Sequence, residues 1–249
     1  PENGMLEFKG WYTSKTNNIK LTSNTEAKKD STYFAQWVQI GEFYPGSVGD
    51  PYIIKSEEEL VSLAEQVNDG NTFKDYYFKL SDHIDTYYLS DWTGIGGGSK
   101  YFEGNFDGNS VTISIDGSSG LFGSLRDAVV KNLTADVNIE GGEQIGGIAN
   151  YAYARNSQVT IEAVVVKGEI SGTSQVGGIV GRGYADLGDG KYKYSVYIEK
   201  CENEATINGS SDYVGGIIGF YWTDNHICKT SNKGNITGKG DAIGGIVGY

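Results

Sequence analysis

Gln175-Val176-Gly177-Gly178-Ile179-Val180-Gly181 decides the fold, because this chain of 249 residues contains the phrase four times. The other copies lie at 144–150 (QIGGIAN), 213–219 (YVGGIIG) and 242–248 (AIGGIVG). The first glycines of the four pairs are 31, 38 and 29 residues apart along the chain. Self-similarity at such a period indicates a solenoid, a propeller or another repeat array.

A twelve-residue segment ahead of each phrase aligns with its counterparts without gaps, at 130–141, 161–172, 198–209 and 227–238. Three columns of this alignment hold one residue class, namely Val130, Ile161, Ile198 and Ile227, then Ile139, Ile170, Ile207 and Ile236, then Gly141, Gly172, Gly209 and Gly238. Such columns are typical of strands that stack about 4.8 Å apart with the same position always facing the interior. We therefore expect an all-β fold, a right-handed parallel β-helix, with each glycine pair relieving crowding at a corner.

A β-propeller is the competing repeat architecture. Propeller blades need about 40 residues for four strands. The shortest spacing between the phrases is only 29 residues, which favours the β-helix.

One amphipathic helix is expected near 56–69, ahead of the repeats. Ser56 and Glu59 form a capping-box pattern, and Gly70 marks the end of the helix. Leu60, Leu63, Ala64 and Val67 fall on one face. Because the terminal turns of a repeat array need a cap, we expect the helix to cover the open end of the core. The acidic run 57–59 fits a solvated helix start better than a metal or acid/base site.

The aromatic residues are the candidate binding residues. Counted from the second glycine of each phrase, Tyr151, Arg182, Phe220 and Tyr249 share one column, and Tyr153, Tyr184 and Trp222 share another. Exposed ladders of this kind suit sugar rings or a protein partner, whereas packing of the rings on their own neighbours is the alternative. The candidate ligand-binding residues are Tyr153, Tyr184, Tyr192, Tyr194, Tyr221 and Trp222.

Catalysis on a β-helix needs paired carboxylates, or carboxylates with a cation and a base. The available pairs are Asp82/Asp85, Asp107/Asp116 and Asp186/Asp189, and several of these residues precede glycine in turn signals. We therefore expect no catalytic residues, no bound metal and no cofactor. A polysaccharide lyase or hydrolase stays as the third reading, and a calcium-binding loop stays open.

The two cysteines fall in different columns of the repeat. Cys201 aligns with Leu133 and Val164 and should point inward, whereas Cys228 aligns with Lys131 and Glu162 and should point outward. Opposed side chains cannot form a disulfide, so we expect two free thiols.

The net charge and the hydropathy of the chain limit the kinds of partner that it can bind. A net charge of −12 disfavours nucleic acid, whose binding rests on Lys and Arg. No run is apolar enough to span a bilayer, and no signal peptide is visible. We expect a mature or excised part of an extracellular protein, secreted or attached to the cell wall, and the last turn has no visible cap.

Residues 41–249 resemble the GLUG-motif family of bacterial surface proteins. The resemblance rests on 120–123 (GLFG), 130–133 (VKNL), 102–109 (FEGNFDGN) and the Gly-Gly copies, in that combination. It implies secreted or wall-attached modular proteins with adhesion-like roles. Some members attach the motif to an IgA-type metallopeptidase, but His83 and His226, the two histidines of this chain, lie outside any His-Glu-x-x-His motif.

Residues 1–40 resemble the second half of an internalin-type B-repeat, also called the Listeria–Bacteroides repeat. The matching stretches are 8–13 (FKGWYT) and 33–37 (YFAQW). The resemblance implies a small, incomplete β-rich surface module, and a β-rich extension of the main domain is the alternative.

The leading hypothesis is a non-enzymatic bacterial cell-surface or secreted module for adhesion or spacing. Its partner would be a glycan or a protein of a host or neighbouring cell, with no membrane insertion. A carbohydrate-binding module using the aromatic ladders is the alternative.

Overall fold

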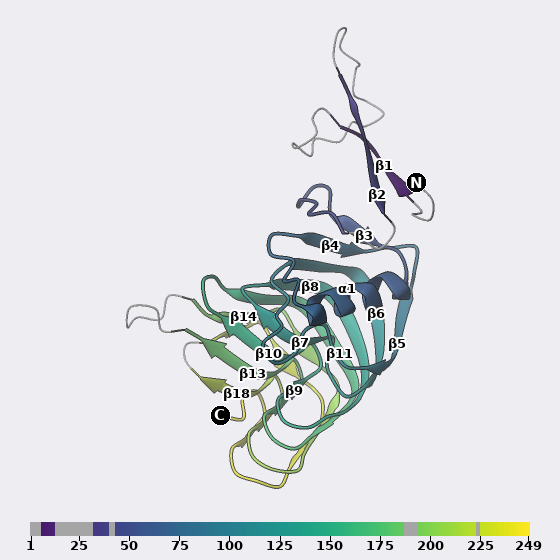
Figure 1. The fold of residues 1–249 in the computed structure, drawn as a ribbon. Helices are drawn as coiled ribbons and strands as arrows, with labels where there is room; N and C mark the ends of the chain where they lie inside the picture. Colours follow the sequence, from purple (N-terminus) through teal and green to yellow (C-terminus); the bar gives the residue numbers. More distant parts are fainter. Residues whose placement is uncertain (1–5, 13–31, 40–42, 187–193, 223–224) are drawn as a thin grey trace.

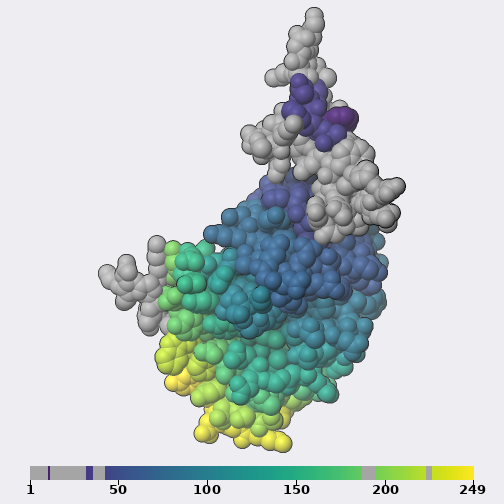
Figure 2. All heavy atoms as spheres, viewed as in Figure 1, coloured from purple at the N-terminus to yellow at the C-terminus, as the bar shows by residue number. Residues whose placement is uncertain are grey.

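A computed structural model describes residues 6–12, 32–39, 43–186, 194–222 and 225–249 of the chain. The described residues from 43 onward wind as a coil, and their colours pass steadily from blue to yellow along one axis (Figure 2). Strands from successive turns lie side by side and point the same way, as the ribbon shows (Figure 1). The fold is therefore the all-β parallel β-helix that the repeat predicts.

Two four-stranded parallel sheets form the faces on either side of the Gly-Gly phrase. The first contains β9 (Ile145–Gly146), β12 (Val176–Gly177), β17 (Val214–Gly215) and β22 (Ile243–Gly244). The second contains β7 (Phe122–Arg126), β10 (Ala149–Ala154), β13 (Val180–Ala185) and β18 (Ile218–Trp222).

A twelve-stranded sheet forms the remaining wall of the coil. Its strands are β3 (Tyr52–Ile54), β4 (Tyr77–Leu80), β5 (Thr86–Trp92), β6 (Asn105–Gly117), β8 (Val129–Glu140), β11 (Val159–Gly172), β14 (Val196–Glu199), β15 (Glu202–Asn203), β16 (Thr206–Gly209), β19 (Asn225–Cys228), β20 (Ser231–Asn232) and β21 (Ile236–Gly238). The wall bends at a column of left-handed residues, Asn132, Ala163, Lys200 and Lys229.

The predicted register is confirmed. Val130, Ile161, Ile198 and Ile227 pair across four turns, as do Ile139, Ile170, Ile207 and Ile236. The first glycines of the phrases pair likewise, from Gly146 to Gly177, Gly215 and Gly244. Side chains from the inward columns fill one continuous core.

The glycine pairs are needed for space rather than for an unusual backbone angle. A Cβ at Gly178 would lie 2.3 Å from the Gly216 carbonyl oxygen, and one at Gly177 would lie 2.1 Å from that of Val180. None of the paired glycines of the phrases has a positive φ. The expectation that these glycines relieve crowding at a corner is confirmed.

The predicted helix is α1 (Glu57–Asp69), and its face of Leu60, Leu63, Ala64 and Val67 is buried in the core. The Ser56 hydroxyl accepts from the Glu59 amide at 3.2 Å, while the Glu59 carboxylate accepts from the Lys55 amide at 2.8 Å. Gly70 ends the helix with φ 112°. Because α1 follows β3, the last strand of its sheet, the helix covers the N-terminal end of the coil (Figure 1).

Strand β1 (Leu6–Tyr12) pairs with β2 (Phe34–Gln39) in a separate antiparallel sheet. This pairing shows that the two stretches meet, and their assignment to a B-repeat stays a prediction. Cys201 is buried and Cys228 is half-buried, and both thiols are free, as the register predicts.

Candidate functional site

An aromatic strip runs along the outer face of the sheet formed by β7, β10, β13 and β18. Two outward columns supply most of it, because Tyr151 pairs with Arg182 and Phe220 in register, and Tyr153 pairs with Tyr184 and Trp222. We define the strip as Tyr101, Arg126, Tyr151, Tyr153, Arg182, Tyr184, Tyr213, Phe220, Trp222 and Tyr249. Its members are half-buried, apart from Trp222 and Tyr249, which are 53% and 62% exposed.

The rings of the strip contact one another from turn to turn. Tyr153 lies 6.3 Å from Tyr101 and 5.4 Å from Tyr184, measured between ring centroids. At the other end, Phe220 stacks on Tyr249 at 5.4 Å and on Trp222 at 6.3 Å. Self-packing and partial exposure therefore occur together, and the strip offers a broad apolar surface with hydroxyl groups along it.

Two arginines are inserted among these rings. The Arg126 guanidinium lies 4.4 Å from the Tyr101 ring centroid and forms an ion pair with Glu103. The Arg182 guanidinium lies between two rings, 5.7 Å from Tyr151 and 5.6 Å from Phe220. Both arrangements are cation–π contacts, which strengthen as water is excluded.

Burial changes the acidity of the strip's phenols. It raises the pKa of Tyr151 to about 12, with Tyr101 adding to the effect and Arg182 opposing it. Burial also raises the pKa of Tyr153, and the hydrogen bond that its hydroxyl donates to Asp186 at 3.0 Å acts in the same direction. Both phenols are therefore neutral at pH 7 and keep a proton that can be donated.

Three of the six predicted site residues lie together in the strip. Tyr153, Tyr184 and Trp222 lie in the strip, whereas Tyr194 is half-buried against the core and Tyr192 lies outside the described residues. The assignment of Tyr221 was wrong, because its side chain is only 6% exposed.

Strand alternation explains the correction. Tyr221 sits between two outward residues of β18, so its own side chain must point inward. It fills the space beside Gly183, where a Cβ would lie 2.4 Å from the Tyr221 ring.

Sequence reasoning left several strip residues out of the candidate site. Arg126 pairs with Tyr153, so extending the column by one turn toward the N-terminus would have found it. Tyr213 is the first residue of the third Gly-Gly phrase, has φ 63° and packs on Phe220 at 5.0 Å. Tyr101 carries no repeat signal, because it lies where the phrase is not yet regular.

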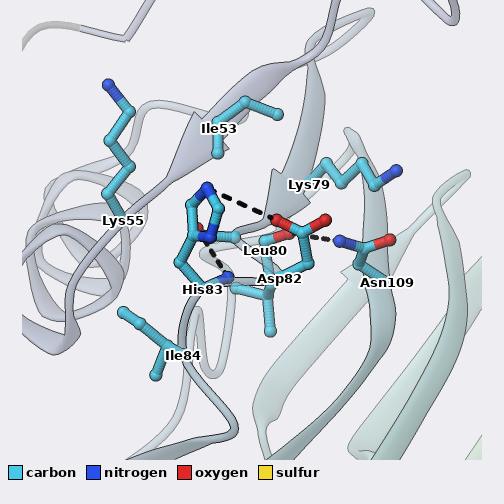
Figure 3. A pocket seen from close by; sticks show the side chains of 9 residues that line it. Ile53, Lys55, Lys79, Leu80, Asp82, His83, Ile84 and Asn109 are labelled. Atoms are coloured by element: carbon cyan, nitrogen blue, oxygen red, sulfur yellow. Dashed lines mark hydrogen bonds and ion pairs between the residues drawn. The ribbon is translucent and has the colours of Figure 1, made fainter.

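Apart from the strip, a hollow lies at the N-terminal end of the twelve-stranded sheet (Figure 3). Its volume is about 440 Å³, and its ionisable side chains are Lys55, Lys79, Asp82 and His83. His83 Nε2 lies 4.0 Å from Asp82 Oδ1, and both side chains are largely exposed. The hollow therefore contains one carboxylate rather than the pair that acid/base glycoside chemistry needs.

Three other carboxylates of the predicted pairs, Asp107, Asp116 and Asp186, have structural contacts. Asp107 accepts from the Asn109 amide at 2.9 Å and from Asn132 at 3.1 Å, and Lys131 lies 3.6 Å away. Asp116 accepts from Asn138 at 3.1 Å. Asp189 lies outside the described residues, and within the described ranges no cluster of three or more potential ligands could hold a metal ion.

Comparison with known proteins places the fold in a wider context. No family model matches the chain. Halomucin from Haloquadratum walsbyi is 34% identical over 167 residues, which cover 58% of this chain and 2% of that protein. The chain thus corresponds to a small fraction of this relative's length.

A solved structure shares the fold. It is a Bacteroides ovatus protein provisionally assigned as an immunoglobulin A1 protease, with a TM-score of 0.58 and 22% identity. The match covers 81% of this chain and 72% of that one. At this identity the likeness supports the parallel β architecture alone.

In the described part of the chain, no helix has the length and hydropathy of a membrane span.

Proposed function

We propose that this chain is a non-enzymatic β-helix module of a bacterial protein that is secreted or attached to the cell wall, and that it serves adhesion or spacing. The aromatic strip is the observation that carries the proposal. Seven strip residues from four turns line up on one sheet face, three more lie beside it, and Trp222 and Tyr249 are exposed aromatic rings. The likeness to halomucin supports an extracellular setting, and the proposed GLUG and B-repeat relationships fit the same role.

The proposed partner is a glycan or a protein of a host or neighbouring cell. Tyrosine and tryptophan combine apolar faces with hydrogen-bonding edges, which suits both sugar rings and protein surfaces. The half-exposed strip favours carbohydrate binding as the specific form of adhesion. Nucleic acid is not proposed, because the net charge is −12.

Binding to a glycan array tests this proposal, with a double variant, Tyr153→Ala and Trp222→Ala, beside the unmodified chain. Tyr88→Ala is the matched control, since Tyr88 is 67% exposed but lies on β5, away from the strip. We expect the chain to bind one class of glycan, the double variant to lose at least tenfold in affinity, and the control to bind normally.

Three other outcomes would change the proposal. Equal binding by all three proteins would remove the strip as the adhesive surface. Absence of binding to every glycan would leave a protein partner or a spacing role, and release of unsaturated or reducing sugars would revive the lyase or hydrolase reading.

A further inference from the structure

The two strip arginines provide an internal comparison. Arg126 stacks on Tyr101, and its guanidinium is ion-paired with the Glu103 carboxylate. Arg182 also lies over tyrosine, at Tyr151, with Phe220 on its other side. Among the described residues no carboxylate lies within 4.0 Å of the Arg182 guanidinium nitrogens, and its buried Nε makes no hydrogen bond.

This arrangement sets Arg182 apart from Arg126 and from five lysines of the coil that form ion pairs, Lys131, Lys167, Lys200, Lys229 and Lys233. These lysines lie on or beside the twelve-stranded sheet and pair with carboxylates of the same or a neighbouring turn, as Lys200 does with Glu162 at 2.6 Å and Lys229 with Glu199 at 3.4 Å. A guanidinium held between two rings is partly removed from water, so an added anionic partner would be bound more strongly there than at an exposed lysine.

From this comparison we infer that Arg182 binds a carboxylate of an acidic polysaccharide, one whose sugar rings lie along the aromatic strip. The planar guanidinium presents a fixed fork that matches a carboxylate in a bidentate manner. Tyr151 and Phe220 hold this fork in place from either side, and the neighbouring rings supply apolar surface for the sugar. The ligand carboxylate would stand to Arg182 as Glu103 stands to Arg126.

The negative charge of the whole chain restricts binding of an acidic polysaccharide to the aromatic strip. With a net charge of −12, most of the surface repels a polyanion. The three arginines of the chain, in contrast, lie in or next to one face, with Arg155 in the turn after β10. Binding should therefore require the strip, and moderate salt should weaken the ionic contribution without removing the contribution of the rings.

The inference rests on the proposed glycan-binding role, and its test separates the two. Calorimetric titration compares oligogalacturonate with its methyl ester, in which the same sugar backbone has lost its charges. We expect the chain to bind oligogalacturonate about tenfold or more tightly than the ester, the order expected for a charge-assisted hydrogen-bond pair.

Three variants test whether the preference for oligogalacturonate over its ester depends on the Arg182 guanidinium. Arg182→Gln should reduce the difference between the two ligands to about threefold or less, and Arg182→Lys should restore only part of it, because lysine has no fork. Arg155→Gln is the control for charge, since it removes an equal charge from an exposed position outside the strip, and it should preserve the preference. Near-ultraviolet circular dichroism and the thermal midpoint verify that each variant keeps its packed rings.

Other results of these titrations would contradict the inference about Arg182. Equal affinity for acid and ester, or an unchanged preference in Arg182→Gln, would overturn the inference. Binding of neutral glycans that is lost in the Tyr153/Trp222 variant would then preserve the proposed function. Binding of neither galacturonan form would overturn the inference, and a glycan array without any binding would in addition remove the carbohydrate-binding role.

Discussion

Individual side chains are placed by the column in which they fall, and the two cysteines show this most clearly. Cys201 shares its column with inward aliphatic residues and is 2% exposed, whereas Cys228 lies in an outward column and is half-buried. Burial raises the pKa of the Cys201 thiol to about 11. Because the thiolate is the reactive form, the two thiols should differ strongly in reactivity.

Thiol labelling checks this placement. At pH 8 a maleimide should modify one thiol of the native chain quickly, and Cys228→Ser should abolish that fast phase. The second thiol should react only after unfolding, since Cys201 is both buried and almost entirely protonated at this pH. Rapid labelling of both thiols in the native state would contradict the assigned register.

The Gly-Gly phrase is the element that shapes the coil, and its importance depends on the turn that follows it. A Cβ at Gly178 would lie 2.4 Å from the Asn203 side chain and 2.3 Å from the Gly216 carbonyl oxygen. At Gly245, the equivalent glycine of the last copy, no atom lies within 4 Å of the same Cβ position. The last five residues of the phrase, Gly-Gly-Ile-Val-Gly, are identical in the two copies, but the surroundings differ.

Alanine substitution should therefore separate the two copies. Gly178→Ala should lower the free energy of unfolding by about 1–3 kcal/mol, the usual cost of overpacking, and by more if the Gly216 backbone cannot shift. Gly245→Ala should change it by less than about 0.5 kcal/mol, as at other unencumbered surface positions. Chemical denaturation measures both, and equal losses would show that the phrase acts through backbone flexibility instead of space.

At the scale of the whole molecule, the coil is a stack in which each turn contacts its neighbours. In such arrays stability is a sum of local terms and nearest-neighbour interfaces. Helix α1 lies at one end of this stack and buries Leu60, Leu63 and Val67 completely. Its contribution should therefore be greatest in the adjoining turns.

Hydrogen exchange can follow this local effect. Leu63→Ala should cost about 2–5 kcal/mol, as for a buried leucine that leaves a cavity, and should speed exchange in β3, β4 and β5. Val61→Ala, on the exposed side of the same helix, should have little effect, because Val61 is 39% exposed. A uniform rise in exchange as far as β18 would show instead that the coil opens as one cooperative unit.

The sequence alone determined the architecture, because parallel stacking requires the same residue class at the same position of every turn. That requirement makes the columns, the capping helix and the two free thiols readable from spacing and hydropathy. It also predicted that Tyr153, Tyr184 and Trp222 share an outward column. The columns did not place Tyr221 correctly among the exposed residues. The alternation of side chains along β18 in the structure shows that Tyr221 points inward.

Only the tertiary structure decided which side chains form a site. Tyr101 comes from a turn in which the repeat is irregular, so no period links it to Tyr153. The ion pair of Arg126 with Glu103, and the contact of Arg126 with the Tyr101 ring, depend on side-chain packing across turns. Such contacts leave no signal in a single sequence, because they follow from three-dimensional proximity and burial and not from spacing along the chain.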